Sequence, residues 1–99
     1  MKTAIELIDD ERKRQIEVEG FTPEHDDEHK YGEIAQAAAC YADPCPRLYE
    51  GTNGEKSYPI DWPWDKKWWK PEKTRIRQLV KAGALIVAEI ERLQRLKNK

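Results

Sequence analysis

The order of hydrophobic and polar residues predicts helices at both ends of the chain and one between them. The first helix is expected over about residues 3–19, a stretch without Pro or Gly. Thr3 and Glu6 fit a capping box at its start, and Gly20 follows its last turn. These local signals place both ends of the first helix.

Two further helices are expected over about 27–42 and 71–96. Acidic residues at the start of the second suit the positive end of a helix dipole. Pro71 is a favoured first-turn residue for the third. The apolar face of the second helix is expected to carry Tyr31, Ile34, Ala38 and Tyr41.

Residues 43–70 are expected to form a long loop rich in tryptophan and proline. All but one of the six prolines lie between positions 43 and 71, and the turn signal Gly-Thr-Asn-Gly occupies 51–54. A connection of this length in a compact domain is usually functional or disordered, and a cluster of indoles argues against disorder. All four tryptophans lie in this loop: Trp62, Trp64, Trp68 and Trp69.

The centre of the third helix, Ala82–Ala88, has no charged residue on any face. A helix that is apolar all round must be covered all round, and the small residues at 82–84 would let another backbone approach closely. One interpretation is a self-association seam, and the other is an ordinary central core helix. The expected fold is therefore all-α: one domain over 1–99, a three-helix unit that assembles into an oligomeric helical bundle.

Polar residues interrupt the apolar stripe of the first helix. Ile5 and Ile8 begin this stripe, but its next positions are Glu11, Arg12 and Gln15. Burying a polar group without a partner costs roughly 2–7 kcal/mol. The pattern therefore predicts either a polar pocket where the helices meet or a stripe that ends in solvated residues.

Residues 25–29, His-Asp-Asp-Glu-His, combine metal-ligand residue types with helical spacing. His25 and His29 are four residues apart, so one helix face would present both, with Asp26 nearby and Glu33 one turn further on. Asp27 lies on the expected inner face of the second helix. The segment suits a divalent ion, or Asp26 or Asp27 simply caps the helix.

Composition limits the classes of function. The 99 residues include 18 Lys and Arg against 19 Asp and Glu, and the net charge of −1 gives no general basic field for nucleic acid. No apolar run reaches the length expected of a membrane span or a signal peptide. Cys40 and Cys45 lack the partners of a zinc site, so reduced thiols in a cytoplasmic protein are expected.

Four strings resemble segments of small phage and prophage proteins: ERKRQ (11–15), EHDD (24–27), GEIAQAA (32–38) and LVKAGALIVAEIERL (79–93). These proteins in turn resemble the MazG-like all-α nucleotide pyrophosphohydrolases. In that superfamily helices pack as an oligomeric bundle, and two acidic motifs, EExxE and ExxD, bind the magnesium ions that hold a nucleoside triphosphate. The resemblance covers the three expected helices and implies a location in the cytoplasm of a bacterial host.

This chain departs from the acidic motifs of that superfamily. Glu33 keeps the last carboxylate of the first motif, but the two earlier positions fall on His29 and Lys30. The ExxD positions fall on Gln78 and Lys81. Because magnesium prefers carboxylate oxygens and a lysine repels it, the resemblance implies a bundle whose catalytic metal site is lost or rebuilt.

The first functional hypothesis is binding without turnover and without a cofactor. A phage-type sponge would capture a signalling nucleotide, such as a cyclic dinucleotide or an ADP-ribose derivative made by a bacterial defence system. Lys and Arg neutralise phosphate directly, and indoles offer faces for base stacking, unless at least two of them plug the open end of the bundle. The expected ligand-binding residues are Glu11, Arg12, Gln15, His25, Trp62, Trp64, Trp68, Trp69, Lys70, Arg77 and Lys81, with Lys66 and Lys67 in the same loop.

Two other functions stay open. A divergent MazG-like hydrolase would cleave a nucleoside triphosphate between its α and β phosphates with magnesium-activated water. A protein-interaction module would instead dock exposed Trp64, Trp68 and Trp69 into a partner. In the hydrolase case the expected metal ligands are Glu11, Asp26, Asp27, His29 and Glu33.

Overall fold

The computed structural model describes residues 1–52 and 54–98. This part of the chain is mainly helical, which confirms the predicted helical character, and it adds one two-stranded antiparallel ribbon that pairs Tyr49 with Tyr58. The elements in chain order are α1 (Ala4–Glu17), α2 (Pro23–Asp27), α3 (Glu33–Ala42), β1 (Leu48–Tyr49), β2 (Tyr58–Pro59), the 3₁₀ turn η1 (Lys66–Trp68) and α4 (Arg75–Lys97).

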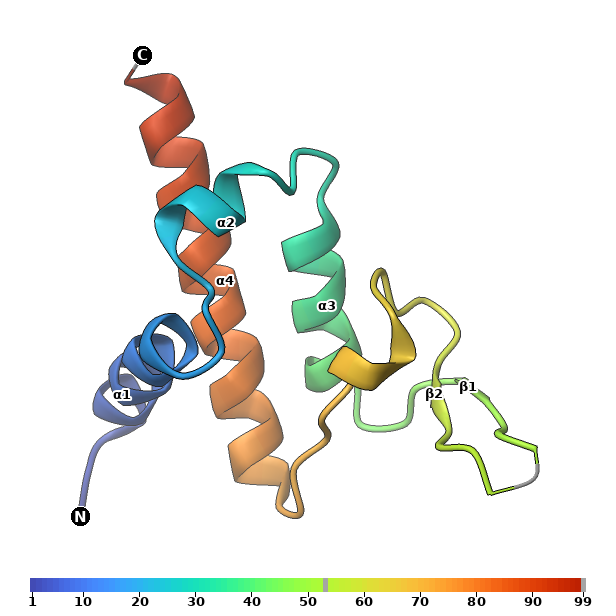
Figure 1. Cartoon of the computed structure of the whole chain (residues 1–99). Helices are drawn as coiled ribbons and strands as arrows, with labels where there is room; N and C mark the ends of the chain where they lie inside the picture. Colours follow the sequence, from blue (N-terminus) through green and yellow to red (C-terminus); the bar gives the residue numbers. More distant parts are fainter. Residues whose placement is uncertain (53, 99) are drawn as a thin grey trace.

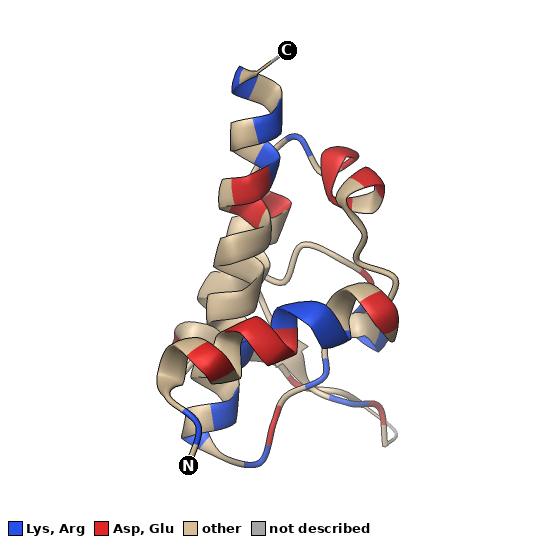
Figure 2. Ribbon diagram, turned by 90° about the vertical axis from the view of Figure 1, so that its left-hand side faces the viewer, with Lys and Arg blue, Asp and Glu red and all other residues tan. Residues whose placement is uncertain are grey.

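The long helix α4 lies at the centre of the arrangement. Helix α3 runs antiparallel along one side of α4, and α1 crosses another side (Figures 1 and 2). Small residues dominate the layer between α3 and α4: Ala37, Ala38, Ala82 and Ala88 belong to one core cluster, and each is at most 2 % exposed. Because small side chains let two helix axes approach closely, this layer forms the main core.

The capping box predicted for the first helix is present. The Thr3 hydroxyl accepts from the Glu6 N–H at 3.2 Å, and Glu6 Oε1 accepts from the Thr3 N–H at 2.9 Å. Where α1 crosses α4, a Cβ atom on Gly83 would lie only 2.7 Å from Ile8 Cδ1. Gly83 therefore admits a close neighbour, as its size suggested, and this neighbour is α1 of the same chain.

The predicted start of the second helix, at about residue 27, is wrong. Gly32 divides the segment 27–42 because its φ of +82° lies in the left-handed region, and α3 begins only at Glu33. Tyr31 consequently precedes the helix and is exposed instead of lying on its apolar face. The separate short helix α2 comes before this turn, capped by the Thr22 hydroxyl.

The loop predicted over 43–70 contains β1, β2 and η1, and its tryptophan-rich part folds back onto α3. Trp62 and Trp69 are buried, and their ring centroids lie 5.6 and 4.6 Å from that of Tyr41. The Lys70 N–H donates to the Tyr41 hydroxyl at 3.1 Å. The interpretation that at least two indoles belong to the core is confirmed for this pair.

Helix α4 begins at Arg75, later than predicted, because the Thr74 hydroxyl supplies its N-cap. Its uncharged centre is mostly covered within the chain: Ala82, Ala84, Leu85 and Ala88 are buried, so the seam predicted over Ala82–Ala88 is not exposed at these four positions. The exposed apolar residues of α4 are Ile76, Leu79, Ile86, Ile90, Leu93 and Leu96. Helix α1 packs on Gly83, between Leu79 and Ile86. Over residues 1–52 and 54–98, no helix has both the length and the apolar character needed to span a membrane.

Candidate functional site

Aromatic side chains surround a cavity of about 380 Å³, here termed the aromatic cavity. Its walls are Glu19, Phe21, His25, His29, Trp64, Asp65 and Trp68. The Phe21 and His25 rings stack with centroids 5.1 Å apart and 14° between their planes, and the His29 ring lies 5.1 Å from that of Trp64. Such flat, largely apolar walls are typical of sites for small heteroaromatic ligands.

The turn after α1 holds Phe21 in the cavity wall. Gly20 has a φ of +77°, which lets the chain leave the helix in a left-handed turn. The Phe21 N–H then donates to the Gln15 carbonyl at 2.9 Å, and the Phe21 carbonyl accepts from Arg12 Nη1 at 3.0 Å. Arg12, which the sequence predicted to face a ligand, therefore fixes the backbone of the wall.

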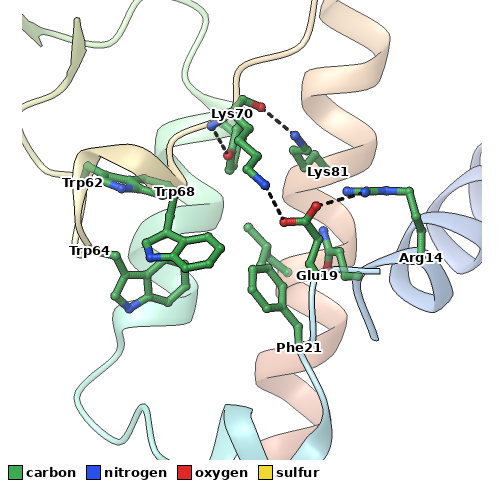
Figure 3. Close-up of a pocket in the computed structure, with 11 residues that line it drawn as sticks. Arg14, Glu19, Phe21, Trp62, Trp64, Trp68, Lys70 and Lys81 are labelled. Carbon is green, nitrogen blue, oxygen red and sulfur yellow. Dashed lines mark hydrogen bonds and ion pairs between the residues drawn. The ribbon is translucent and has the colours of Figure 1, made fainter. Parts of the chain in front are cut away.

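A narrower space, here termed the polar end, adjoins the aromatic cavity (Figure 3). It shares four wall residues with the aromatic cavity: Glu19, Phe21, Trp64 and Trp68. Its free volume of about 20 Å³ is the room that one water molecule needs. Its remaining walls are Arg14, Gln15, Tyr41, Trp62, Lys70, Lys81 and Leu85.

The carboxylate of Glu19 lies at the polar end and pairs with two cations. It accepts from Lys70 Nζ at 3.0 Å and lies 3.3 Å from Arg14 Nη1 (Figure 3). Burial raises the pKa of Glu19, but these cations outweigh burial and keep the pKa below its ordinary value. Burial lowers the pKa of Lys81, against the opposing charge of Glu72 at 3.3 Å.

Glu11 and Gln15 lie buried behind the polar end, each 2 % exposed. The Glu11 carboxylate accepts from Arg14 and Arg77 at 2.9 Å and from Gln15 Nε2 at 3.2 Å. Burial would raise the pKa of Glu11, but the hydrogen bond and charge of Arg14, with the charge of Arg77, hold it below its ordinary value. The alternative that the polar stripe of the first helix ends in solvent is wrong for Glu11, Arg12 and Gln15.

The carboxylates expected to bind magnesium are each held by other groups of the chain. Asp26, 2 % exposed, accepts from Arg12 Nη2 at 2.9 Å, and Asp27 accepts from Arg95 Nη2 at 2.8 Å. Glu33, at the start of α3, accepts from a backbone N–H at 2.6 Å. Among the described residues, no three His, Cys, Asp or Glu side chains form a group suited to a metal ion.

The structure brings together most, not all, of the predicted ligand-binding residues. Those that line one or both spaces are Gln15, His25, Trp62, Trp64, Trp68, Lys70 and Lys81. Glu11, Arg12 and Arg77 are engaged in hydrogen bonds and ion pairs beside these spaces, and Trp69 lies in the core.

The predicted ligand-binding residues did not include six lining residues, Arg14, Glu19, Phe21, Tyr41, Asp65 and Leu85, and His29 was assigned only to a metal. Gly20 was the available signal for two of them, since a left-handed turn there returns the chain to the helices and places its neighbours at the junction. Comparisons with models of protein families, with curated proteins and with solved structures find no match for this chain.

Proposed function

We propose that this protein binds a nucleotide-type small molecule in the aromatic cavity and releases it unchanged. The observation that carries the proposal is the combination of aromatic walls with cations: Lys67 Nζ and Lys70 Nζ each lie 5.5 Å from the centre of the Trp68 ring. A base stacked on an aromatic ring gains about 1–3 kcal/mol. The Lys67 ammonium beside the Trp68 ring would neutralise the phosphate of the ligand, and Lys70, which pairs with Glu19, would add to it by exchanging that partner. The cavity volume of about 380 Å³ falls in the range of small-molecule sites.

The carboxylates that could bind magnesium already pair with other groups of the chain, which supports binding of the ligand without its hydrolysis. A magnesium ion that used Asp26 would have to displace Arg12, and removing one partner of a buried ion pair costs about 3–5 kcal/mol. Capture needs no cofactor, and a signalling nucleotide such as a cyclic dinucleotide or an ADP-ribose derivative combines a base with negative charge. This is the ligand class that we assign to the cavity.

The proposal includes a second copy of the chain, bound through the exposed apolar face of α4. Ile86, Ile90 and Leu93 follow the three–four spacing by which helices pair, and an apolar face left uncovered on a lone chain favours association. Because a copy presents the same face, one symmetric contact covers both. The face is made of Ile86, Ile90 and Leu93, on the C-terminal side of the point where α1 packs on Gly83, and Ile86 is the one of the three that lies within the seam predicted at Ala82–Ala88.

A depletion-and-recovery assay tests capture. The protein is mixed with nucleoside triphosphates, cyclic dinucleotides and ADP-ribose compounds, once with magnesium and once with a chelator, and the filtrate is analysed by chromatography before and after heat denaturation. A compound that disappears and returns intact in both conditions supports capture. Conversion to monophosphate and pyrophosphate only with magnesium establishes the hydrolase instead. A panel that passes unchanged overturns nucleotide binding and favours docking of a protein partner on the indoles.

A matched pair of variants locates the bound compound. Trp68 is 43 % exposed, so Trp68→Ala should leave the fold intact while removing a stacking face, and it should weaken capture by roughly 10- to 100-fold. Tyr31→Ala removes an aromatic side chain that is 92 % exposed and lines neither space, so it should bind as the native chain does. Equal affinity of both variants would place the ligand elsewhere.

A further inference from the structure

Gln15 has an unpaired acceptor at the polar end. Its side chain is 2 % exposed and lines this space, yet no partner of its Oε1 atom lies among the described residues. A buried amide oxygen without a hydrogen bond is unfavourable. A donor on a bound ligand would satisfy it.

Glu11 determines which amide atom of Gln15 remains free. Gln15 Nε2 donates to Glu11 Oε2 at 3.2 Å, and the same carboxylate accepts from Arg14 and Arg77 at 2.9 Å. An ionised carboxylate only accepts hydrogen bonds, so the reversed amide would set oxygen against oxygen. The free atom is therefore the acceptor Oε1, and a ligand group at the polar end has to donate a hydrogen bond to it.

Trp64 supplies the complementary group. Its Nε1 is the other buried side-chain atom without a partner in the described part of the chain, and Trp64 lines both the polar end and the aromatic cavity. The indole N–H only donates. One unpaired acceptor and one unpaired donor thus belong to residues that line these adjoining spaces, and a base that carries an amino group and a ring nitrogen acceptor offers the complement of each.

We propose that Gln15 selects nucleotides whose base carries an exocyclic amino group, as in adenine or cytosine. This inference rests on the nucleotide binding proposed above. The polar end has room for a group about the size of one water molecule, and an amino group projects from the ring far enough to enter it. Hypoxanthine and uracil carry a carbonyl oxygen at the same position, which would face Gln15 Oε1 as a second acceptor.

Two pairs of ligands isolate this contact: AMP with IMP and CMP with UMP, each compared by equilibrium dialysis. The amino member of each pair should bind roughly 10- to 100-fold more tightly, because its partner leaves the buried acceptor unsatisfied. Gln15→Met keeps the length of the side chain and removes the acceptor, so both ratios should fall to about one. Gln94→Met makes the same change at an exposed position of α4 and should keep the ratios.

The outcomes separate the two proposals. Equal affinities within both pairs for the native chain overturn the role of Gln15 and leave nucleotide binding in place. No binding by any of the four overturns the role of Gln15, and it overturns nucleotide binding as well where the panel of the depletion assay also passes unchanged. Ratios that persist in a folded Gln15→Met variant also overturn the role of Gln15. The comparison of ligands on the native chain needs no variant. Trp64→Phe removes the N–H donor and part of the ring, and it should lower the affinity ratio within both ligand pairs, which tests the contact without Gln15→Met.

Discussion

Arg12 Nη2 lies 2.9 Å from Asp26 Oδ2, and the two side chains are only 7 % and 4 % exposed. This pair joins α1 to α2. The same guanidinium donates through Nη1 to the carbonyl of Phe21 at 3.0 Å. One buried arginine therefore fixes both the short helix and the turn that carries a wall of the aromatic cavity, so the site depends on an ion pair that no ligand needs to touch.

Arg12→Met should destabilise the chain by about 3–5 kcal/mol, because it leaves the Asp26 carboxylate buried without a compensating charge. Adding Asp26→Ala should recover part of this loss. Urea unfolding followed by circular dichroism measures both. Lys13→Ala, which breaks an exposed pair with Asp9 on α1, is the control and should leave the midpoint unchanged. Similar losses for the buried and the exposed pair would contradict the assignment.

Glu11 should make stability dependent on pH in the acid range. Burial opposes ionisation of Glu11, but Arg14 and Arg77 outweigh it and lower the pKa below the ordinary 4.5. The unfolded chain therefore takes up a proton before the folded chain does as pH falls. The stabilisation is present above about pH 4.5 and is lost as pH falls through the folded pKa.

Glu11→Gln should consequently show a shallower decline of unfolding free energy below pH 4.5 than the native chain, as read from urea unfolding at several pH values. Glu17→Gln changes an exposed carboxyl of the same helix and should keep the native slope. A native slope in Glu11→Gln would show that the carboxyl is not favoured in its ionised form by the fold.

Local signals in the sequence were sufficient where local contacts decide the structure. Thr3 and Glu6 cap the helix that contains them, so a four-residue pattern predicted the start of α1. The predicted start of the second helix was wrong because glycine is tolerated inside helices. The left-handed φ of Gly32 is required only by the turn between α2 and α3. The start of α3 was therefore outside the reach of a local pattern.

The sequence predicted which types of residue form the site, but it did not predict which side chains pair with one another. The sequence predicted buried polar groups and indoles at the junction of the helices, and the structure places Gln15 and Trp64 there. The pairing of Arg77 with Glu11 depends on how α1 crosses α4. That crossing is set by a contact between residues far apart in the chain, so neighbouring residues carry no signal for it.

Cys40 and Cys45 should react at very different rates with iodoacetamide. Cys40 lies in the core, where burial, with the nearby charges of Asp61 and Asp43, raises its pKa to about 11, whereas Cys45 is exposed. Since the thiolate is the reactive form, Cys45 should be labelled at least about tenfold faster at pH 8, as measured by peptide mass spectrometry. Labelling in denaturant should equalise the two, and equal rates in the native chain would contradict the burial of Cys40.

The exposed face of α4 should decide the oligomeric state. The chain has a mass of 11.7 kDa, and light scattering after size exclusion should give a larger mass at micromolar concentration. Ile90 is 50 % exposed in the single chain, so Ile90→Lys should fold normally. Burying the exposed half of this isoleucine in a contact contributes about 1 kcal/mol, and a lysine in its place would bring an unpaired charge into that contact.

Ile90→Lys should therefore run at 11.7 kDa under conditions in which the native chain is larger. Gln36→Lys adds the same charge at an exposed position of α3, away from this face, and it should keep the native mass. A native chain that stays at 11.7 kDa at every concentration would remove the second copy from the proposal. The aromatic cavity would remain, because all of its walls come from one chain and none of them belongs to the exposed face of α4.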